Sequence, residues 1–281
     1  MERYILTLRC ADQPGIVHAL AGGIVKAKGN ILESAQFSDP PTGLFCMRVS
    51  FESPDRDVAA VRGLVAGAVD RFEPALTLRR ESLRTRVLVM VSRLDHCLAD
   101  LLYRWDIGEL PADLRLVVSN HEDCRPLAER YGVEFVHVPV TAATKPQAEA
   151  RLLELIAGHQ IDVVVLARYM QVLSDDLCRR LEGRAINIHH SFLPGFKGAR
   201  AYQQAYERGV KLIGATAHFV TADLDEGPII GQDVARVSHA DSAGQMAAIG
   251  RDVERVVLAR AVRRFAEDRV LLAGARTVVF G

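Results

Sequence analysis

Neither sign of charge dominates this chain, and it has no long apolar run. Its 281 residues include 35 Lys and Arg and 35 Asp and Glu, so the formal net charge is zero. Nucleic-acid binding needs clustered excess basic charge, and a membrane span needs about 18 apolar residues in a row. Residues 1–9 are an apolar stretch too short for a signal peptide. We therefore expect a cytoplasmic protein with no nucleic-acid or membrane partner, whose ligand is a small molecule or another copy of the chain.

Cysteines are also few. The chain has five, an odd number, and they are widely separated, with no Cys-x-x-Cys pair (Cys10, Cys46, Cys97, Cys124 and Cys178). This spacing argues against a disulfide framework and against a thiolate zinc site. It fits a reducing compartment.

The length predicts two globular domains, at roughly 150 residues per domain. The composition is 49% hydrophobic and 25% charged, which is typical of globular proteins. In the first part, apolar residues alternate or recur at helical spacing in the order strand 4–10, helix 16–25, strands 30–37 and 44–51, helix 58–72 and strand 75–78. This order, βαββαβ, is the ferredoxin-like arrangement. Asp12 is predicted to cap the first helix, with Pro14 and Gly15 in its first turn.

Residues 79–86 are polar and basic and are predicted to be a linker, so the boundary is placed between domains 1–82 and 83–281. Beyond it, short apolar strands alternate with helices. The strands are predicted at 87–91, 114–118, 135–138, 163–167, 185–190, 213–220 and 229–234, and the helices include 98–105, 148–156 and 242–266. Continuous apolar strands between helices indicate an α/β domain with a mostly parallel sheet covered on both faces.

The most informative segment is Ile186-Asn187-Ile188-His189-His190-Ser191. Asn187 and His189 are two residues apart on a predicted strand, so both side chains project to one face. In open α/β sheets ligands bind beyond the carboxyl ends of the strands. An amide donor can hold a carbonyl oxygen that gains negative charge, and an imidazole titrates near neutral pH. The pair is suited to attack on a carbonyl.

A carboxylate from the turn at 223–228 can supply a third member that orients the imidazole and manages its proton. Two alternatives stay open on spacing alone. Adjacent histidines at a strand end can be surface or capping residues, and an Asp-rich turn before Gly-Pro can be turn chemistry. A metal-dependent amidohydrolase is a further alternative, with candidate ligands His189, His190, His218, Asp223 and Asp225, although no strong ligand spacing supports it.

The motifs Asn187-Ile188-His189, Ser191–Pro194, His218-Phe219-Val220 and Asp225-x-Gly227-Pro228 together resemble the folate-dependent formyltransferase family. The resemblance covers about residues 85–281 and includes the segment 166–174. It implies a Rossmann-like fold in which the family's conserved Asn, His and Asp correspond to Asn187, His189 and Asp225. The substrate it implies is 10-formyltetrahydrofolate.

Three details resemble the hydrolytic branch of that family, in which water accepts the formyl group. One is the string Ser-x-x-x-His-Cys-Leu at residues 92–98, in the loop after the first strand of the second domain. This loop has no glycine, whereas members that transfer to a phosphorylated amine have a Gly-rich phosphate loop there. The other two details are the doubled His189-His190 and Gly198-Ala199-Arg200. Hydrolysis to formate and tetrahydrofolate is implied, with no metal or other cofactor. Formyl transfer to an amine, or a non-catalytic sensing protein, are the alternatives.

The same resemblance implies further site residues. The pterin is expected against Met170, Gln171, Leu173 and Val220, while His190, His96 and Cys97 are expected on the acceptor side. The hydrolytic branch has an N-terminal ACT domain, and the segment Asp12-Gln13-Pro14-Gly15-Ile16 is similar to the ACT signature. A small amino-acid effector is therefore expected at Asp12, Pro14, Gly15 and Ile16, together with a homo-oligomer, either a dimer or a tetramer.

Overall fold

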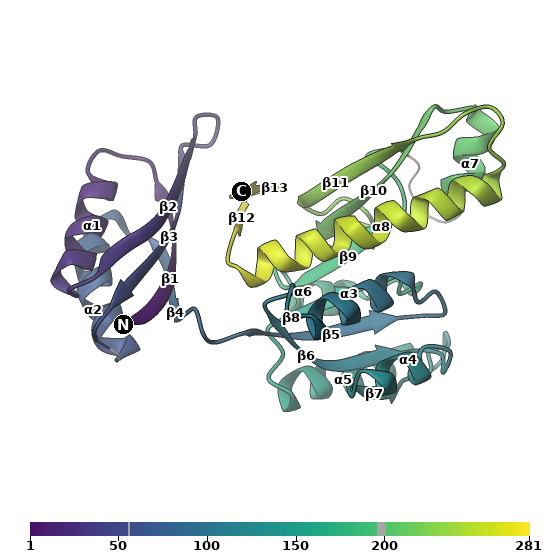
Figure 1. Ribbon diagram of the computed structural model, residues 1–281, viewed down its shortest axis with the longest axis horizontal. Coiled ribbons are helices and arrows are strands. Elements are labelled where there is room, and N and C mark those ends of the chain that lie inside the picture. The colour runs from purple at the N-terminus through teal and green to yellow at the C-terminus, as the bar shows by residue number, and fades with distance from the viewer. Residues whose placement is uncertain (56, 196–200) are drawn as a thin grey trace. The chain divides into compact units, whose positions relative to one another are not determined.

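The computed structural model describes residues 1–55, 57–195 and 201–281. The chain divides into two compact units, which are coloured along the sequence in Figure 1. The first comprises Met1–Arg84, Asp268–Ala273 and Val278–Gly281, and the second comprises Thr85–Glu267 and Gly274–Thr277. Each unit has its own hydrophobic core and is described separately.

The first unit has the predicted βαββαβ order. Its elements are β1 (Glu2–Ala11), α1 (Ile16–Lys26), β2 (Asn30–Asp39), β3 (Leu44–Ser53), α2 (Val58–Val69), a 3₁₀ turn at Asp70–Phe72 and β4 (Ala75–Arg80). The antiparallel sheet has the strand order β2-β3-β1-β4. Alternate residues of β1 (Tyr4, Leu6 and Leu8) are fully buried in one cluster with α1 and α2. The two helices therefore cover the face of the sheet that the period-two pattern makes apolar.

The first turn of α1 differs from the prediction. Gly15 is the N-cap residue, with φ of 96°, and no side chain caps the helix. Asp12 instead accepts a hydrogen bond from the Ser38 hydroxyl of β2. The prediction was wrong because Asp12 lies three residues before the N-cap, and the left-handed turn at Gly15 separates it from the helix.

The predicted linker is shorter than residues 79–86. Arg79 and Arg80 are the last residues of β4, and Thr85 and Arg86 begin β5, so only residues 81–84 connect the two sheets. These arginines look like linker residues because they are polar. They are held by ion pairs instead: Arg79 Nε lies 2.6 Å from Asp268 Oδ2, and Arg86 Nη2 lies 2.9 Å from Asp162 Oδ1.

The C-terminal residues belong mostly to the first unit, whereas the sequence placed all of 83–281 in the second. Leu271 and Phe280 are buried against Cys46 of β3, which points away from the helices. Arg269 Nη1 also lies 2.9 Å from Glu33 Oε1 of β2. The second face of β3 needs an apolar cover, and these residues, around β12 (Val270–Ala273) and β13 (Arg276–Val279), provide it.

The second unit is a mixed α/β fold around a seven-stranded sheet. Its elements are β5 (Thr85–Val91), α3 (His96–Asp106), β6 (Ala112–Ser119), α4 (Arg125–Arg130), β7 (Glu134–His137), α5 (Lys145–Gly158), β8 (Val163–Leu166), α6 (Asp175–Arg180), β9 (Ala185–His189), α7 (Ala201–Arg208), β10 (Leu212–Phe219), β11 (Ile229–Arg236) and α8 (Ala243–Ala266). The strand order is β11-β10-β9-β8-β5-β6-β7. The strands from β9 to β7 are parallel, and β10 and β11 are antiparallel. The predicted mostly parallel sheet is confirmed.

Helices pack on the apolar strands as the composition requires. Leucines of α5 and α6, including Leu152 and Leu177, form one cluster with Leu88 and Met90 of β5. Helix α8 contacts α3 and strands β9, β10 and β11 (Figure 1). Full burial of each such side chain contributes about 1.5–3 kcal/mol. Within the described part of the chain, no helix combines the length and the apolarity that crossing a membrane requires.

Candidate active site

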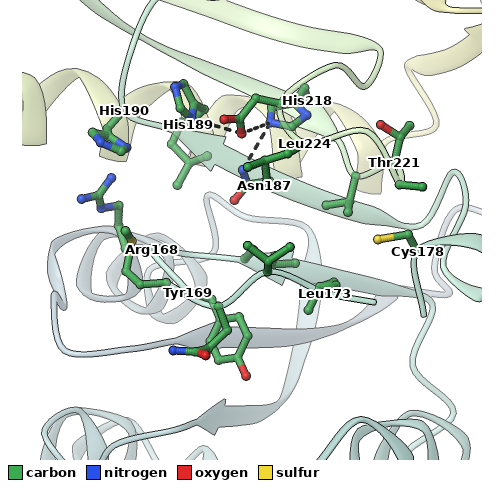
Figure 2. Close-up of a pocket in the computed structure, with 18 residues that line it drawn as sticks. Arg168, Tyr169, Leu173, Cys178, Asn187, His189, His190, His218, Thr221 and Leu224 are labelled. Carbon is green, nitrogen blue, oxygen red and sulfur yellow. Dashed lines mark hydrogen bonds and ion pairs between the residues drawn. The ribbon is translucent and has the colours of Figure 1, made fainter. Parts of the chain in front are cut away.

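A pocket opens at the carboxyl ends of β8 and β9, where the strand topology predicts a ligand site (Figure 2). Its walls are formed by residues 168–173 after β8, by Asn187, His189 and His190 in and after β9, and by residues 220–222, 224 and 225 after β10. The predicted catalytic residues Asn187, His189 and Asp225 all line this one pocket. The spacing of Asn187 and His189, together with the resemblance that singled out Asp225, thus predicted residues that lie at one pocket, while their chemical roles remain a proposal.

Asn187 is oriented by His218, which lies opposite it on the neighbouring strand. Nδ1 of His218 is 2.8 Å from the Phe219 carbonyl oxygen, and that oxygen can only accept, so Nδ1 donates and Nε2 is left as an acceptor. Asn187 Nδ2 lies 3.2 Å from this Nε2 and donates to it. Burial lowers the pKa of His218, which keeps the ring neutral. The second N–H of the Asn187 amide is then available to a ligand.

His189 faces a buried carboxylate. Its Nδ1 is 3.2 Å from Asp225 Oδ1, and both side chains are only 5% exposed. The same carboxylate oxygen is 3.9 Å from His218 Nε2. Dashed lines in Figure 2 mark these contacts. The carboxylate beside Nδ1 orients the ring, so Nε2 is the nitrogen that faces away from Asp225 and can exchange a proton with a substrate.

The turn that carries Asp225 is held tightly against β10. Phe219 donates its N–H to the Pro228 carbonyl oxygen at 2.9 Å, which closes residues 220–227 into a loop. A Cβ built on Gly227 would lie 1.7 Å from the Phe219 carbonyl oxygen, so only glycine fits there. Asp225 itself has φ of 59°, a left-handed conformation that Asp tolerates better than most residues. The Asp-x-Gly-Pro motif therefore both forms the turn and places the Asp225 side chain at the pocket.

The structure places five of the seven predicted substrate-binding residues at the pocket. Met170, Gln171, Leu173, His190 and Val220 line it. Met170 is 52% exposed, whereas Leu173 also belongs to the core cluster under α5 and α6. The segment 168–173 is fixed by a hydrogen bond to the residue after β5, because Met170 donates its backbone N–H to Ser92 Oγ at 2.9 Å.

His96 and Cys97 do not line the pocket. His96 Nε2 lies 2.8 Å from Glu254 Oε2, and Cys97 is fully buried beside it. Burial, followed by the Glu254 charge, raises the pKa of the Cys97 thiol well above its usual value, so the thiol is not an activated nucleophile. The predicted Gly198-Ala199-Arg200 loop lies outside the described residues.

Sequence reasoning missed the buried Glu254 cluster. Tyr202 of α7 donates its hydroxyl to Glu254 Oε1 at 2.5 Å, and Arg168 Nε lies 3.4 Å from Oε2. Burial raises the pKa of Glu254, but the hydrogen bonds from His96 and Tyr202 and the nearby charge of Arg168 outweigh it. The pKa therefore lies below its usual value and the group is a carboxylate.

A metal ion is a poor fit to this cluster. His96, Cys97 and Glu254 could offer three ligand atoms within 4.8 Å of one another. However, the guanidinium of Arg168 already neutralises the carboxylate, and an added cation would meet it at close range. The Glu254 carboxylate already has a cationic partner in Arg168, so we assign no metal-dependent step to this cluster.

Because of buried His190, we expect the free energy of unfolding to depend measurably on pH. Burial and then the nearby Arg168 charge lower its pKa to about 4, against an ordinary value near 6.5. The unfolded chain therefore binds an extra proton between these values, and stability falls as pH drops from 6.5 to 4, by about 2–3 kcal/mol. Urea unfolding from pH 7.5 to 4.5 checks this. His190→Gln should reduce the loss, whereas His18→Gln at an exposed histidine should not.

Comparison with known proteins identifies the family. A family model described as Formyl transferase matches residues 85–262. A formyltetrahydrofolate deformylase of Corynebacterium sp. (strain P-1) is 49% identical over 280 residues, which cover 99% of this chain and 98% of that protein. A crystal structure of formyltetrahydrofolate deformylase from Burkholderia mallei ATCC 23344 is 50% identical, with a TM-score of 0.95 and full coverage of both chains. The chain belongs to the formyltetrahydrofolate deformylase family.

A second likeness covers only part of the chain. Glycinamide ribonucleotide transformylase 1 from Symbiobacterium toebii is 32% identical with a TM-score of 0.66, over 70% of this chain and 95% of that one. The formyltransferase fold is thus common to both, and Asn187, His189 and Asp225 lie within the residues that the Formyl transferase model matches. The deformylase-family chain extends well beyond the portion shared with the transformylase.

Proposed function

We propose that this chain hydrolyses 10-formyltetrahydrofolate to formate and tetrahydrofolate, without a metal, through Asn187, His189 and Asp225. The main support is that Asn187, oriented by His218, and His189, paired with Asp225, line one pocket in a chain of this family. In the reaction the formyl C–N bond breaks, a C–O bond to water forms, and the folate nitrogen takes a proton. The acid product then loses a proton and leaves as formate.

Each residue has a role that its geometry supports. Asn187 donates the N–H not used by His218 to the formyl oxygen. His189, protonated against Asp225, stabilises the oxyanion and shuttles a proton. Asp225 positions the water and the ring and relays the proton towards the departing folate nitrogen. The pterin lies against Met170, Gln171, Leu173 and Val220, and His190 faces the acceptor side.

The test is incubation of the purified full chain with 10-formyltetrahydrofolate as the sole substrate. Formate and tetrahydrofolate should appear in equal amounts, and the rate should survive dialysis against a strong chelator. Turnover that needs an added amine would support formyl transfer instead. Loss of activity on chelation, restored by a metal, would overturn the metal-free step.

We also propose that the first unit is an ACT-type regulatory module in a homo-oligomer, dimer or tetramer. Asp12, Pro14 and Gly15 form an exposed turn that can receive a small amino acid, whereas the Ile16 side chain is 2% exposed and holds the turn from inside the core. The edge strand β2 exposes Ile31 and Phe37, which favours contact with another copy. Light scattering and amino-acid titrations with rate measurement test both parts.

A further inference from the structure

Arg168 stands out because nothing in the proposed reaction uses it. It follows β8 with φ of 63°, a left-handed conformation that is costly for a residue with a long side chain. The backbone there is fixed on both sides: Ala167 donates its N–H to the Met90 carbonyl oxygen at 2.8 Å, and Ser92 donates to the Arg168 carbonyl oxygen at 3.3 Å. The fold thus holds this arginine at the pocket wall despite the strain.

The guanidinium is largely buried, and within the described residues its Nε has no hydrogen-bond partner. The Arg168 side chain is 10% exposed, and its ion pair with Glu254 is 3.4 Å long, without hydrogen-bond geometry at Nε. Glu254 is meanwhile hydrogen-bonded by Tyr202 and His96. A guanidinium carries five N–H donors in a planar fork. The Glu254 carboxylate, 3.4 Å from Nε, therefore offsets the burial of the charge.

The guanidinium is turned towards His190, the neighbour of the proposed catalytic residue His189. Figure 2 shows the Arg168 guanidinium pointing to His190, and both residues line the same pocket. The ring centre of His190 is 5.0 Å from that of His189. A neutral His190 can add one more N–H donor. Arg168 and His190 thus form a cationic, donor-rich corner next to His189.

We propose that Arg168 and His190 form a subsite for a small carboxylate beside His189. The fork of a guanidinium matches the two oxygens of a carboxylate, and a buried charge-assisted pair of this kind is stronger than a neutral hydrogen bond. Under the proposed function, on which the ligand's identity rests, the carboxylate is formate, the anion that the reaction leaves at this point. Added formate is then a product inhibitor that acts through Arg168.

The first experiment measures binding without turnover. Sodium formate is titrated into the purified full chain by calorimetry, at constant ionic strength with chloride as the balancing anion. Arg168→Met should weaken formate binding at least tenfold. Arg168→Lys should weaken it less, because a point charge remains but the fork is lost. The matched control is Arg260→Met, at an exposed arginine paired with Asp233 in the same unit, which should bind formate like the wild type.

Absence of formate binding to the wild type, or unchanged binding to folded Arg168→Met, would overturn the subsite. If Arg168→Met does not fold, a crystal of the wild type soaked in formate decides: a carboxylate on Arg168 supports the subsite, and formate only elsewhere contradicts it. In the active enzyme, formate inhibition should weaken at least tenfold in Arg168→Met and by a smaller factor in Arg168→Lys. A chain that binds formate but does not hydrolyse 10-formyltetrahydrofolate would refute the proposed function and leave the subsite standing.

Discussion

Replacement of Asp225 by Asn should lower kcat for hydrolysis of 10-formyltetrahydrofolate by about 10³- to 10⁴-fold, as for the orienting carboxylate of other His-dependent hydrolases. The carboxylate contacts His189 Nδ1 at 3.2 Å and is 5% exposed. An amide of the same size keeps the packing but removes the negative charge beside His189 Nδ1 and no longer fixes the ring in one orientation. The proton relay to the folate nitrogen is lost with it.

The control for Asp225→Asn lies in the same turn. Asp223 is exposed, and its backbone oxygen, not its side chain, accepts the bond from Thr221. Asp223→Asn should keep kcat within about twofold of the wild type. Melting curves of both variants show whether the turn is intact. Activity of a folded Asp225→Asn protein within tenfold of the wild type would remove Asp225 from the proposed mechanism.

The pair Asn187 and His189 was predictable because its signals are local, whereas the family resemblance was needed to choose Asp225 among the carboxylates of the following turn. The period of two on a strand puts Asn187 and His189 on one face whatever surrounds the strand, and β9 obeys it. Gly227 and Pro228 mark a tight turn, which brings Asp225 back to the end of the sheet. The topology of a parallel sheet then makes the strand end the meeting point.

The Glu254 cluster could not be predicted in the same way. Glu254 is one of seven charged residues in a helix of 24 residues, and charged residues usually face water. Its partners His96, Arg168 and Tyr202 come from α3, the segment after β8 and α7, so only the tertiary structure brings them together. A signal did exist for His218, which is the one ionisable residue in the apolar run of β10.

The domain boundary shows a different limit of sequence reasoning. Residues 268–281 follow the long helix α8 directly, so sequence order assigns them to the second unit. They belong to the first unit because Leu271 and Phe280 pack on Cys46, on the face of the sheet that α1 and α2 do not cover. The available hint in the sequence was the apolar run Leu44-Phe45-Cys46-Met47 in β3, which is continuous and does not alternate, as in strands covered on both faces.

Asn187→Ala should lower kcat/KM by about 10²- to 10³-fold, the usual cost of one lost oxyanion donor. The loss should fall on kcat more than on KM, because the amide bonds the oxygen most strongly when it is charged. Steady-state kinetics with 10-formyltetrahydrofolate measure both parameters. A folded Asn187→Ala protein with near wild-type turnover would contradict the role of the amide.

His218 provides a test of how that amide is held. Asn187 Nδ2 lies 3.2 Å from His218 Nε2, so His218→Phe should remove the acceptor while it keeps a ring of similar size, and we expect a loss of about tenfold. If His218 acts only by orienting Asn187, the double variant should be no slower than Asn187→Ala alone. Additive losses would mean instead that His218 acts on the substrate or on Asp225, which lies 3.9 Å from the same nitrogen.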